Sequence, residues 1–249
     1  MTDTRPSLTI IGFGAFGRLL AHHLAPHASL TILDADPTAR DAARARGLDV
    51  LTDPSALTAD IVVLAVPLPA LGTCLAQIAP HLRPGQIVAD TCSIKEAPAR
   101  LMRELLPKHV EVLATHPMFG PNSAGKDLRG QQLVLCPVRG KRWRRLGALL
   151  RRGLGLQVIV TTPTEHDRQA AVTQGLTHLL ARAFSMLGDQ PRIRTRSFAL
   201  MSDALAMVAG DAPEVFEAVT RQNPHVLPLA RDFTQKLKAL GETALTSGD

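Results

Sequence analysis

The sequence predicts an α/β fold, with a doubly wound sheet in the N-terminal part of the chain and helices alone in the C-terminal part. Three observations support this prediction. Short apolar, β-branched runs alternate with alanine-rich stretches up to about residue 162, as in a mainly parallel sheet covered by helices. The run Ile61–Val66 is apolar throughout and ends at Pro67, which is typical of a strand buried on both faces. After Glu165 the strand pattern stops and long helical periods follow.

The expected elements can be placed in order along the chain. Strands are expected at Leu8–Ile11, Leu30–Leu33, Ile61–Val66, Gln86–Ala89, Val110–Ala114, Gln132–Cys136 and Gln157–Val160. Helices are expected between them at Ala15–Leu24, Leu71–Leu82, Pro98–Leu106 and Arg142–Arg152. The C-terminal helical periods are Asp167–Leu187, Ala199–Val208, Pro213–Thr220 and Val226–Leu240. We therefore divide the chain into residues 1–162 and residues 163–249.

Composition excludes several classes of protein. The 249 residues are 45% apolar and 20% charged, which supports a folded core and argues against a disordered chain. No apolar run is as long as a membrane span. The three cysteines form no C-x-x-C pair, so we expect neither a disulfide framework nor a metal site, and a cytoplasmic location. The sequence has no tyrosine, which excludes any mechanism that needs a tyrosine acid or base.

A glycine loop follows the first strand directly and opens the first helix. Its pattern G-x-G-x-x-G indicates a Rossmann-type dinucleotide-binding domain, because strand, loop and helix come in the required order. The first glycine permits a tight turn, the second lets a pyrophosphate approach, and the third lets helix and strand pack closely. The free N–H groups at the start of the helix favour phosphate. We expect the coenzyme to bind along the loop, at Gly12, Phe13, Gly14, Ala15, Phe16 and Gly17.

The nature of the coenzyme is indicated by the end of the second strand. Asp34 lies where a carboxylate accepts hydrogen bonds from the adenosine ribose and repels a 2′-phosphate. The next residue is Ala35 rather than an arginine, so we predict NAD. NADP stays open as the alternative because Arg40 is near in sequence. Val66 and Pro67, at the end of the third strand, are also expected to contact the coenzyme.

Polar clusters mark the ends of the later strands and the start of the helical part. They are Asp90–Lys95, Thr115–Pro121, Glu165–Asp167 and Thr173–His178. With His-Pro-Met-Phe-Gly-Pro at 116–121, Asp-x-x-Ser-Ile-Lys at 90–95, and Glu-His-Asp followed by Gln-x-x-x-His, the sequence resembles the prephenate and arogenate dehydrogenases of tyrosine biosynthesis. The resemblance runs from about residue 7 to about residue 190.

This resemblance implies an NAD(P)-dependent oxidative decarboxylation, of prephenate to 4-hydroxyphenylpyruvate or of arogenate to tyrosine. His116 would take the proton of the substrate hydroxyl as base, and Ser93 would lie beside it at the nicotinamide end. His178 would bind the substrate's side chain or carboxylate, and Lys95 would be a structural partner. Since no regulatory or chorismate-mutase segment follows the helical part, we expect a single activity.

The sequence departs from the family at one position. Our alignment puts Met207 where the family carries an arginine that pairs with a substrate carboxylate. Arg194, Arg196 and Arg221 are the candidates to replace that arginine, from the same subunit or a neighbouring one. The departure leaves the substrate open among prephenate, arogenate and an amino-substituted prephenate.

Each candidate residue also has a structural interpretation. His116 could cap a turn before Pro117, and Ser93 could cap the next helix in a capping box with Glu96. His178 could be a satisfied histidine between helices. We treat His166 and Asp167 as the start of a helix, with the carboxylate complementing the helix dipole.

Two other functions compete with the dehydrogenase. The β-hydroxyacid and 6-phosphogluconate type of dehydrogenase combines the same two kinds of domain, but its lysine on the first long helix is absent here. A non-catalytic nucleotide- or nucleic-acid-binding module would use the basic stretch Arg139–Arg145 with Arg151 and Arg152. The formal net charge is +6, yet helical spacing spreads these charges over one exposed face, so we expect no nucleic-acid partner.

The helical part has more apolar surface than one packed layer can cover. One stripe consists of Leu176, Leu179, Leu180, Phe184 and Leu187, and a second consists of Phe198, Leu200, Met201, Leu205 and Met207. We expect one stripe to pack on the N-terminal domain and the other to need a partner, which predicts a homodimer through the helical domain.

Overall fold

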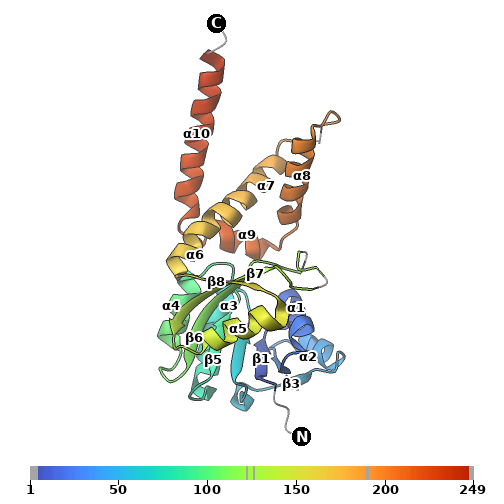
Figure 1. The fold of residues 1–249 in the computed structure, drawn as a ribbon, viewed down its shortest axis with the longest axis vertical. Coiled ribbons are helices and arrows are strands. Elements are labelled where there is room, and N and C mark those ends of the chain that lie inside the picture. The colour runs from blue at the N-terminus through green and yellow to red at the C-terminus, as the bar shows by residue number, and fades with distance from the viewer. Residues whose placement is uncertain (1–4, 122, 126, 189–190, 247–249) are drawn as a thin grey trace. The chain divides into compact units, whose positions relative to one another are not determined.

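The computed structural model describes residues 5–121, 123–125, 127–188 and 191–246 (Figure 1). The chain divides into two compact units, Met1–Pro163 and Thr164–Asp249, which we call the first and second units. The first unit is α/β and the described residues of the second form helices and turns, so the predicted fold class is confirmed. Within the described ranges, no helix is both long enough and apolar enough to span a membrane.

One mixed sheet runs through the first unit. Its strands are β1 (Ser7–Ile11), β2 (Ser29–Leu33), β3 (Asp49–Leu51), β4 (Ile61–Leu64), β5 (Ile87–Asp90), β6 (Glu111–Pro117), β7 (Gln132–Arg139) and β8 (Gln157–Val160). Their spatial order is β3-β2-β1-β4-β5-β6-β7-β8, so β2 and β3 follow on one side of β1, and the strands from β4 onward follow on its other side. The pairs are parallel except β6 and β7, which are antiparallel, a feature that the strand–helix alternation had not indicated.

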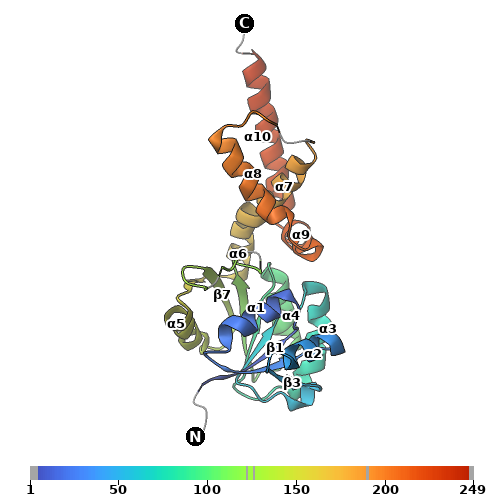
Figure 2. The same cartoon turned by 90° about the vertical axis from the view of Figure 1, so that its right-hand side faces the viewer.

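Helices cover both faces of this sheet. They are α1 (Ala15–Leu24), α2 (Pro37–Arg44), α3 (Leu68–Ile78), α4 (Glu96–Leu105) and α5 (Trp143–Leu154), with short 3-10 turns η1 (Pro54–Ala56) and η2 (Ala79–His81). Apolar residues of α3 and α4 form one core with the sheet, and those of α1, α2 and α5 form the core on the opposite face. Figure 2 shows α3 and α5 on opposite sides of the strands.

Apart from the 3-10 turns, one helix and one strand of the first unit were not expected from the sequence, and both are short. Helix α2 is amphipathic but poor in apolar residues, although its start carries a clear signal. Asp36 accepts a hydrogen bond from the N–H of Thr38 (2.9 Å), and Pro37 opens the first turn. Strand β3 has three residues at the sheet edge, too few to show an alternating pattern.

The second unit begins with one long helix that changes type along its length. It starts as α6 (Pro163–Ala170), continues as a π-helical stretch η3 (Ala171–Leu176) and ends as α7 (Thr177–Ser185). Helices α8 (Arg196–Ala209), α9 (Pro213–Thr220) and α10 (Val226–Thr246) follow. A Cβ built on Gly175 of η3 would lie 2.3 Å from a methyl of Val226 and 2.9 Å from the carbonyl oxygen of Val219, so a glycine lets η3 pack closely on α9 and α10.

The two predicted apolar stripes of the second unit meet each other in part. Helices α7 and α8 pack together, with the rings of Phe184 and Phe198 5.7 Å apart between centroids. This corrects the expectation that each stripe needs a separate partner. Nevertheless, all fourteen residues of α8 are at least partly exposed, and Leu200 and Met207 are 59% and 64% exposed. Helix α10 packs against η3 and α9, and Figure 1 shows its far end diverging from α7 and α8.

Candidate functional site

The glycine loop makes a turn that only glycine fits. Gly12 has φ +97°, and its N–H donates to the carbonyl oxygen of Leu33 (2.9 Å). A Cβ at Gly12 would lie 2.6 Å from the carbonyl oxygen of Ala65, and one at Gly17 would lie 2.0 Å from that of Gly12 itself. Both positions therefore exclude larger residues because backbone atoms approach them closely.

Gly14 differs from the other two glycines because the space around it is open. It holds the N-cap position of α1 with φ −67°, and among the described residues no atom lies within 4 Å of a Cβ built there. Gly14 has no side chain that could cap the first-turn N–H groups of α1. Those groups have no acceptor within the helix, and the dipole adds positive charge. This arrangement suits a phosphate group.

Asp34 lies beside this loop, at the end of β2. Its Oδ2 accepts a hydrogen bond from the N–H of Phe13 (2.6 Å), and its Oδ1 accepts one from the N–H of Asp36 (2.8 Å). The guanidinium of Arg40 donates from Nη1 to the carbonyl oxygens of Asp34 and Ala35, both at 2.8 Å. The Asp34 carboxylate and the Arg40 guanidinium therefore lie together at the carboxyl end of β2.

Phe13, a predicted coenzyme contact, is used within the protein. Its N–H donates to Asp34, and its carbonyl oxygen accepts from Nε of Arg18 (3.0 Å). Its ring is fully buried, with the guanidinium carbons of Arg18 and Arg46 each 5.6 Å from the ring centroid. Phe13 thus contributes to the core and to the shape of the loop.

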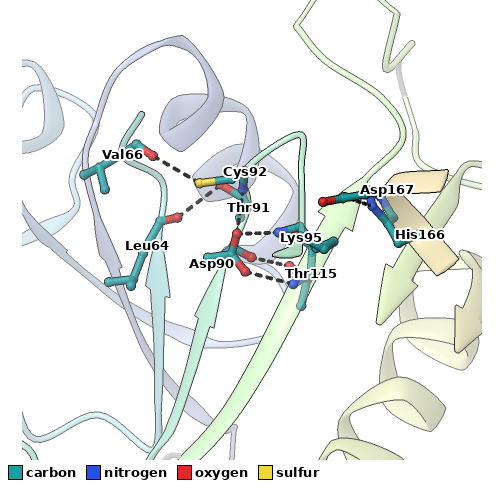
Figure 3. A network of polar contacts seen from close by, with 9 residues as sticks. All are labelled: Leu64, Val66, Asp90, Thr91, Cys92, Lys95, Thr115, His166 and Asp167. Atoms are coloured by element: carbon teal, nitrogen blue, oxygen red, sulfur yellow. Dashed lines mark hydrogen bonds and ion pairs between the residues drawn. The ribbon is translucent and has the colours of Figure 1, made fainter. Parts of the chain in front are cut away.

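A buried polar network joins the ends of β5 and β6 (Figure 3). The side chains of Asp90 and Lys95 are 0% exposed and form an ion pair. Asp90 also accepts from the N–H of Cys92 (2.9 Å) and of Thr115 (3.1 Å). Lys95 Nζ donates to the carbonyl oxygen of Thr115 (2.6 Å), and the Thr115 hydroxyl donates to that of Asp90.

The same loop is also linked to the end of β4. The hydroxyl of Thr91 donates to the carbonyl oxygen of Leu64 (3.1 Å), and Cys92 Sγ lies 3.9 Å from that of Val66. Burial and the neighbouring Asp90 carboxylate raise the pKa of the Cys92 thiol, which therefore stays protonated and can donate. The structure thus brings together the carboxyl ends of β4, β5 and β6, with Val66 and Pro67 on the first of these ends.

Ser93 and His116 adjoin this network from two elements. His116 lies within β6, paired with Val134 of β7, and is 4% exposed. Val112 and Ala114, four and two residues before His116, share its face of the strand and belong to the core under α3 and α4. The imidazole therefore faces that side of the sheet. Ser93 is half-buried in the loop between β5 and α4.

This placement removes two of the structural interpretations. His116 continues the strand and does not cap a turn, because β6 extends to Pro117 rather than ending at Ala114. Ser93 does not cap α4, since the helix begins at Glu96 and Lys95 holds the N-cap position.

His178 lies in the second unit with a hydrogen-bond partner for each ring nitrogen. Nδ1 lies 2.9 Å from the carbonyl oxygen of Gln174, and Nε2 lies 3.1 Å from a carboxylate oxygen of Asp211. A carbonyl oxygen only accepts, so Nδ1 carries a proton. The ring is 4% exposed, as expected of a histidine satisfied between helices. Asp211 was not foreseen as its partner.

The His166–Asp167 pair lies within the long helix of the second unit rather than at its start, because the helix begins at Pro163 and Glu165 is the acidic residue of its first turn. Nδ1 of His166 lies 2.7 Å from the carboxylate of Asp167, and both residues are buried. The carbonyl oxygen of Asp167 accepts from the side-chain amide of Asn223 (2.8 Å), which fixes this part of the long helix to the segment before α10.

The three candidate substrate arginines are exposed. Nε of Arg194 donates to the carbonyl oxygen of Pro191 (2.8 Å), and Arg221 pairs with Glu217 at 3.3 Å on α9. Arg196 opens α8 while Met207 lies near its other end, so about 16 Å of helix separates them. Within one subunit, Arg196 therefore lies far from Met207, the position to which we aligned the family's arginine.

Several arginines of the basic stretch support the fold. Arg139 donates to the carbonyl oxygens of Val110 (2.9 Å) and Pro107 (2.7 Å), and Arg142 donates to that of Gly85. Arg151 donates to the carbonyl oxygen of Val158 (3.0 Å). These guanidinium groups hold loops and strand ends, which favours the structural interpretation over a nucleic-acid surface.

The fold and the loop define a class of protein. A switch point between β1 and β4, a glycine loop that opens α1, and a carboxylate at the end of β2 are the parts of a dinucleotide-binding domain. Residues 16–160 match the family described as prephenate dehydrogenase, nucleotide-binding domain. The chain belongs to this family.

Individual proteins extend the comparison. The chain is 32% identical to a 4-amino-4-deoxyprephenate dehydrogenase of Streptomyces pristinaespiralis, over 96% of this chain and 84% of that protein. It is 30% identical to a probable arogenate/prephenate dehydrogenase of Methanocaldococcus jannaschii, over 74% of this chain. The chain spans only 43% of the length of the archaeal protein. The fold is that of prephenate dehydrogenase from A. aeolicus, crystallised with hydroxyphenyl propionate and NAD+, with a TM-score of 0.78, 19% identity and coverage of 99% of this chain and 93% of that one.

Proposed function

We propose that the protein is an NAD-dependent dehydrogenase that oxidatively decarboxylates prephenate to 4-hydroxyphenylpyruvate or arogenate to tyrosine. The observation that carries this proposal is the junction at the ends of β5 and β6. There Ser93 and His116, in the two family motifs, adjoin one buried network at the carboxyl edge of a dinucleotide-binding sheet. Open α/β sheets bind their ligands at this edge.

The residues of the first unit fit the coenzyme. Open space at Gly14 and the first turn of α1 would receive the pyrophosphate. Asp34 would accept from the ribose hydroxyls, and Val66 and Pro67 lie on the same edge of the sheet. Arg40 beside Asp34 leaves NADP as the alternative coenzyme.

The chemistry assigned to the side chains is acid–base. When bound, NAD supplies the acceptor for the hydride of the ring carbon that bears the 4-hydroxyl. His116 takes the hydroxyl proton, and Ser93 orients the imidazole and the substrate. The ring carboxylate leaves as carbon dioxide, and the ring becomes aromatic. His178 would hold the substrate's side chain or carboxylate through Nε2, in exchange for its partner Asp211.

A second candidate substrate is an amino-substituted prephenate. Two observations favour it: Met207 stands where we align the family's carboxylate-binding arginine, and the Streptomyces relative is named for 4-amino-4-deoxyprephenate. The reaction class is the same, with the ring carbon bearing an amino group in place of the hydroxyl. His116 would then accept a proton from nitrogen.

The proposal extends to partners and location. Exposed apolar side chains on α8 and α10 favour a homodimer through the second unit, which could bring Arg194, Arg196 or Arg221 to a neighbouring substrate site. The coenzyme and three buried cysteines that form no disulfide suit a reducing compartment, so we place the protein in the cytoplasm.

The test is an assay of reduced coenzyme. Purified protein is incubated with NAD or NADP and with prephenate, arogenate or 4-amino-4-deoxyprephenate, and the absorbance of the reduced nicotinamide is followed. Turnover with NAD and prephenate or arogenate supports the proposal. Turnover with the amino compound alone selects the second candidate. Absence of turnover with all three rejects the oxidative decarboxylation.

A further inference from the structure

Strand β6 extends further than β5, its parallel neighbour in the sheet. The β5–β6 ladder runs from Ile87 and Glu111 to Ala89 and Leu113 and then ends. Strand β6 nevertheless continues to Pro117, paired with β7 alone. In a strand the N–H and C=O groups of one residue point to the same side, so those of Thr115 face the side that β5 has left. Both groups are buried there and need partners.

Side chains supply these partners in place of a strand. Asp90 accepts from the N–H of Thr115 (3.1 Å), and Lys95 donates to its carbonyl oxygen (2.6 Å). The ion pair between Asp90 and Lys95 completes a closed ring of hydrogen bonds (Figure 3). The chain from Thr91 to Ile94 therefore leaves the sheet as a loop while its two ends stay bonded to β6.

We infer that the Asp90–Lys95 pair is a positioning element for the reaction: it holds Ser93 at a fixed place relative to His116. This inference rests on the proposed function, which assigns those two residues to the chemistry. Ser93 lies between Cys92 and Lys95, which both donate to Asp90. His116 directly follows Thr115, and the pair binds both the N–H and the C=O group of Thr115. Two bonds of the ring thus set the distance between the loop and the strand, and the ion pair holds the two ends of the loop together.

The charges themselves support positioning rather than stability. Removing two charges from water is costly, and replacing a buried ion pair by uncharged groups of similar size is often neutral or stabilising. An ion pair whose side chains are 0% exposed is therefore expected to add little to the free energy of unfolding. Such a pair is well suited to orienting the segments around it, because each charged group binds several partners at fixed angles.

Removing both charges together separates the two roles. Lys95→Met alone leaves Asp90 charged and buried, and we expect it to destabilise the protein. The double variant Asp90→Asn/Lys95→Met leaves no uncompensated charge, so its urea midpoint should return close to that of the wild type. Its kcat should stay about 10²-fold low, because a small misplacement of reacting groups has an effect of that size. NAD should still bind, because the glycine loop is untouched, and a coenzyme titration therefore separates the loss of kcat from a loss of the coenzyme site.

The matched control is Gln86→Met, at the opposite end of β5. Gln86 is also a buried polar residue, and it bonds the carbonyl oxygen of Ala59 (2.7 Å) and the N–H of Arg83 (2.6 Å). Its replacement should lower the urea midpoint and leave kcat at the wild-type value. Thr115→Val serves if the double variant does not fold, because it removes, at nearly constant shape, the hydroxyl that donates to the carbonyl oxygen of Asp90, a bond beside the ring that joins the same loop to the same strand. We expect about a tenfold loss of kcat from it, with rate and stability again uncoupled.

The outcomes are distinct. A folded double variant with wild-type kcat overturns the inference, as does a loss of kcat that Gln86→Met reproduces, or a Thr115→Val variant with full activity. Wild-type protein without turnover on any of the three substrates rejects the proposed function, and the positioning role with it. Active wild-type protein beside a slow, stable double variant supports both.

Discussion

At the scale of single residues, the coenzyme end of the site is fixed before any ligand arrives. The Asp34 carboxylate accepts from two backbone amides, one of them in the glycine loop, so the fold sets its direction. The Arg40 guanidinium donates hydrogen bonds to two backbone carbonyl oxygens of the same turn. We therefore expect the choice between the two nicotinamide coenzymes to depend on this carboxylate and this cation, which share one small region.

Replacing Asp34 by asparagine should weaken NAD use and narrow the preference over NADP. Asparagine keeps an acceptor for the ribose but removes the charge that repels a 2′-phosphate. The measurement is kcat/KM with each coenzyme. Asp36→Asn removes a neighbouring charge that caps α2, and it should leave the preference unchanged. Wild-type protein that already prefers NADP would show the assignment of Asp34 to be wrong.

His116→Asn should reduce kcat by about 10²–10⁴-fold and leave NAD affinity near that of the wild type. Asparagine can keep a hydrogen bond but cannot take the proton at neutral pH. Steady-state kinetics and a coenzyme titration give the two numbers. An equal loss of NAD binding would mark His116 as a residue of the fold, and a fully active variant would remove it from the reaction.

The sequence indicates which residues carry the chemistry better than it indicates what holds them. Ser93 and His116 follow from motifs, and Asp34 follows from its strand end. The bonds from Asp90 and Lys95 to the backbone of Thr115 do not follow, because they depend on where the β5–β6 ladder stops. The pairing of His178 with Asp211 joins residues 33 positions apart and depends on how α7 and α9 pack.

At the scale of elements, strong local signals gave accurate bounds. Helix α1 is found at Ala15–Leu24 and α9 at Pro213–Thr220, both as predicted, because a glycine turn or a proline fixes the start. Strand β6 runs three residues beyond its expected end, since pairing with β7 extends it. Such a tertiary effect leaves no trace in local composition.

The glycine loop offers a paired test of this local architecture. Gly17→Ala should lower the free energy of unfolding by about 1–3 kcal/mol or more, because its Cβ would meet a backbone oxygen at 2.0 Å. Gly14→Ala should leave stability within about 0.5 kcal/mol and weaken NAD binding, since its Cβ would enter the space assigned to the pyrophosphate. Urea unfolding and NAD titration check both variants. A stable Gly17→Ala protein, or a Gly14→Ala protein with full NAD affinity, would contradict this account.

At the scale of the whole molecule, apolar surface is spread unevenly between the units. In the second unit Leu187 is 79% exposed, and Leu240 on α10 is 69% exposed. Large exposed apolar side chains gathered on a few helices usually mark an interface. An identical subunit is the usual partner for such a surface.

Light scattering at low micromolar concentration should therefore give about twice the chain mass of 26.7 kDa. We expect the interface to bury more than about 2,000 Å² in total, as obligate dimers do. Leu200→Glu on α8 should shift the protein towards monomer by placing a charge in that interface. Leu105→Glu, at an exposed apolar position of the first unit, should leave the mass unchanged. A stable and active wild-type monomer would reject the dimer.

The π-helical stretch η3 has a consequence for how this protein can vary in length over evolution. An α-helix turns by about 100° per residue, so an inserted residue normally rotates everything beyond it. A π turn accommodates the extra residue locally and leaves both flanking segments in place. His166 with Asp167 lies before η3, and His178 with Asp211 lies after it. A descendant could therefore lose one residue between Ala171 and Leu176, revert to a plain α-helix there, and still present both histidines to their partners.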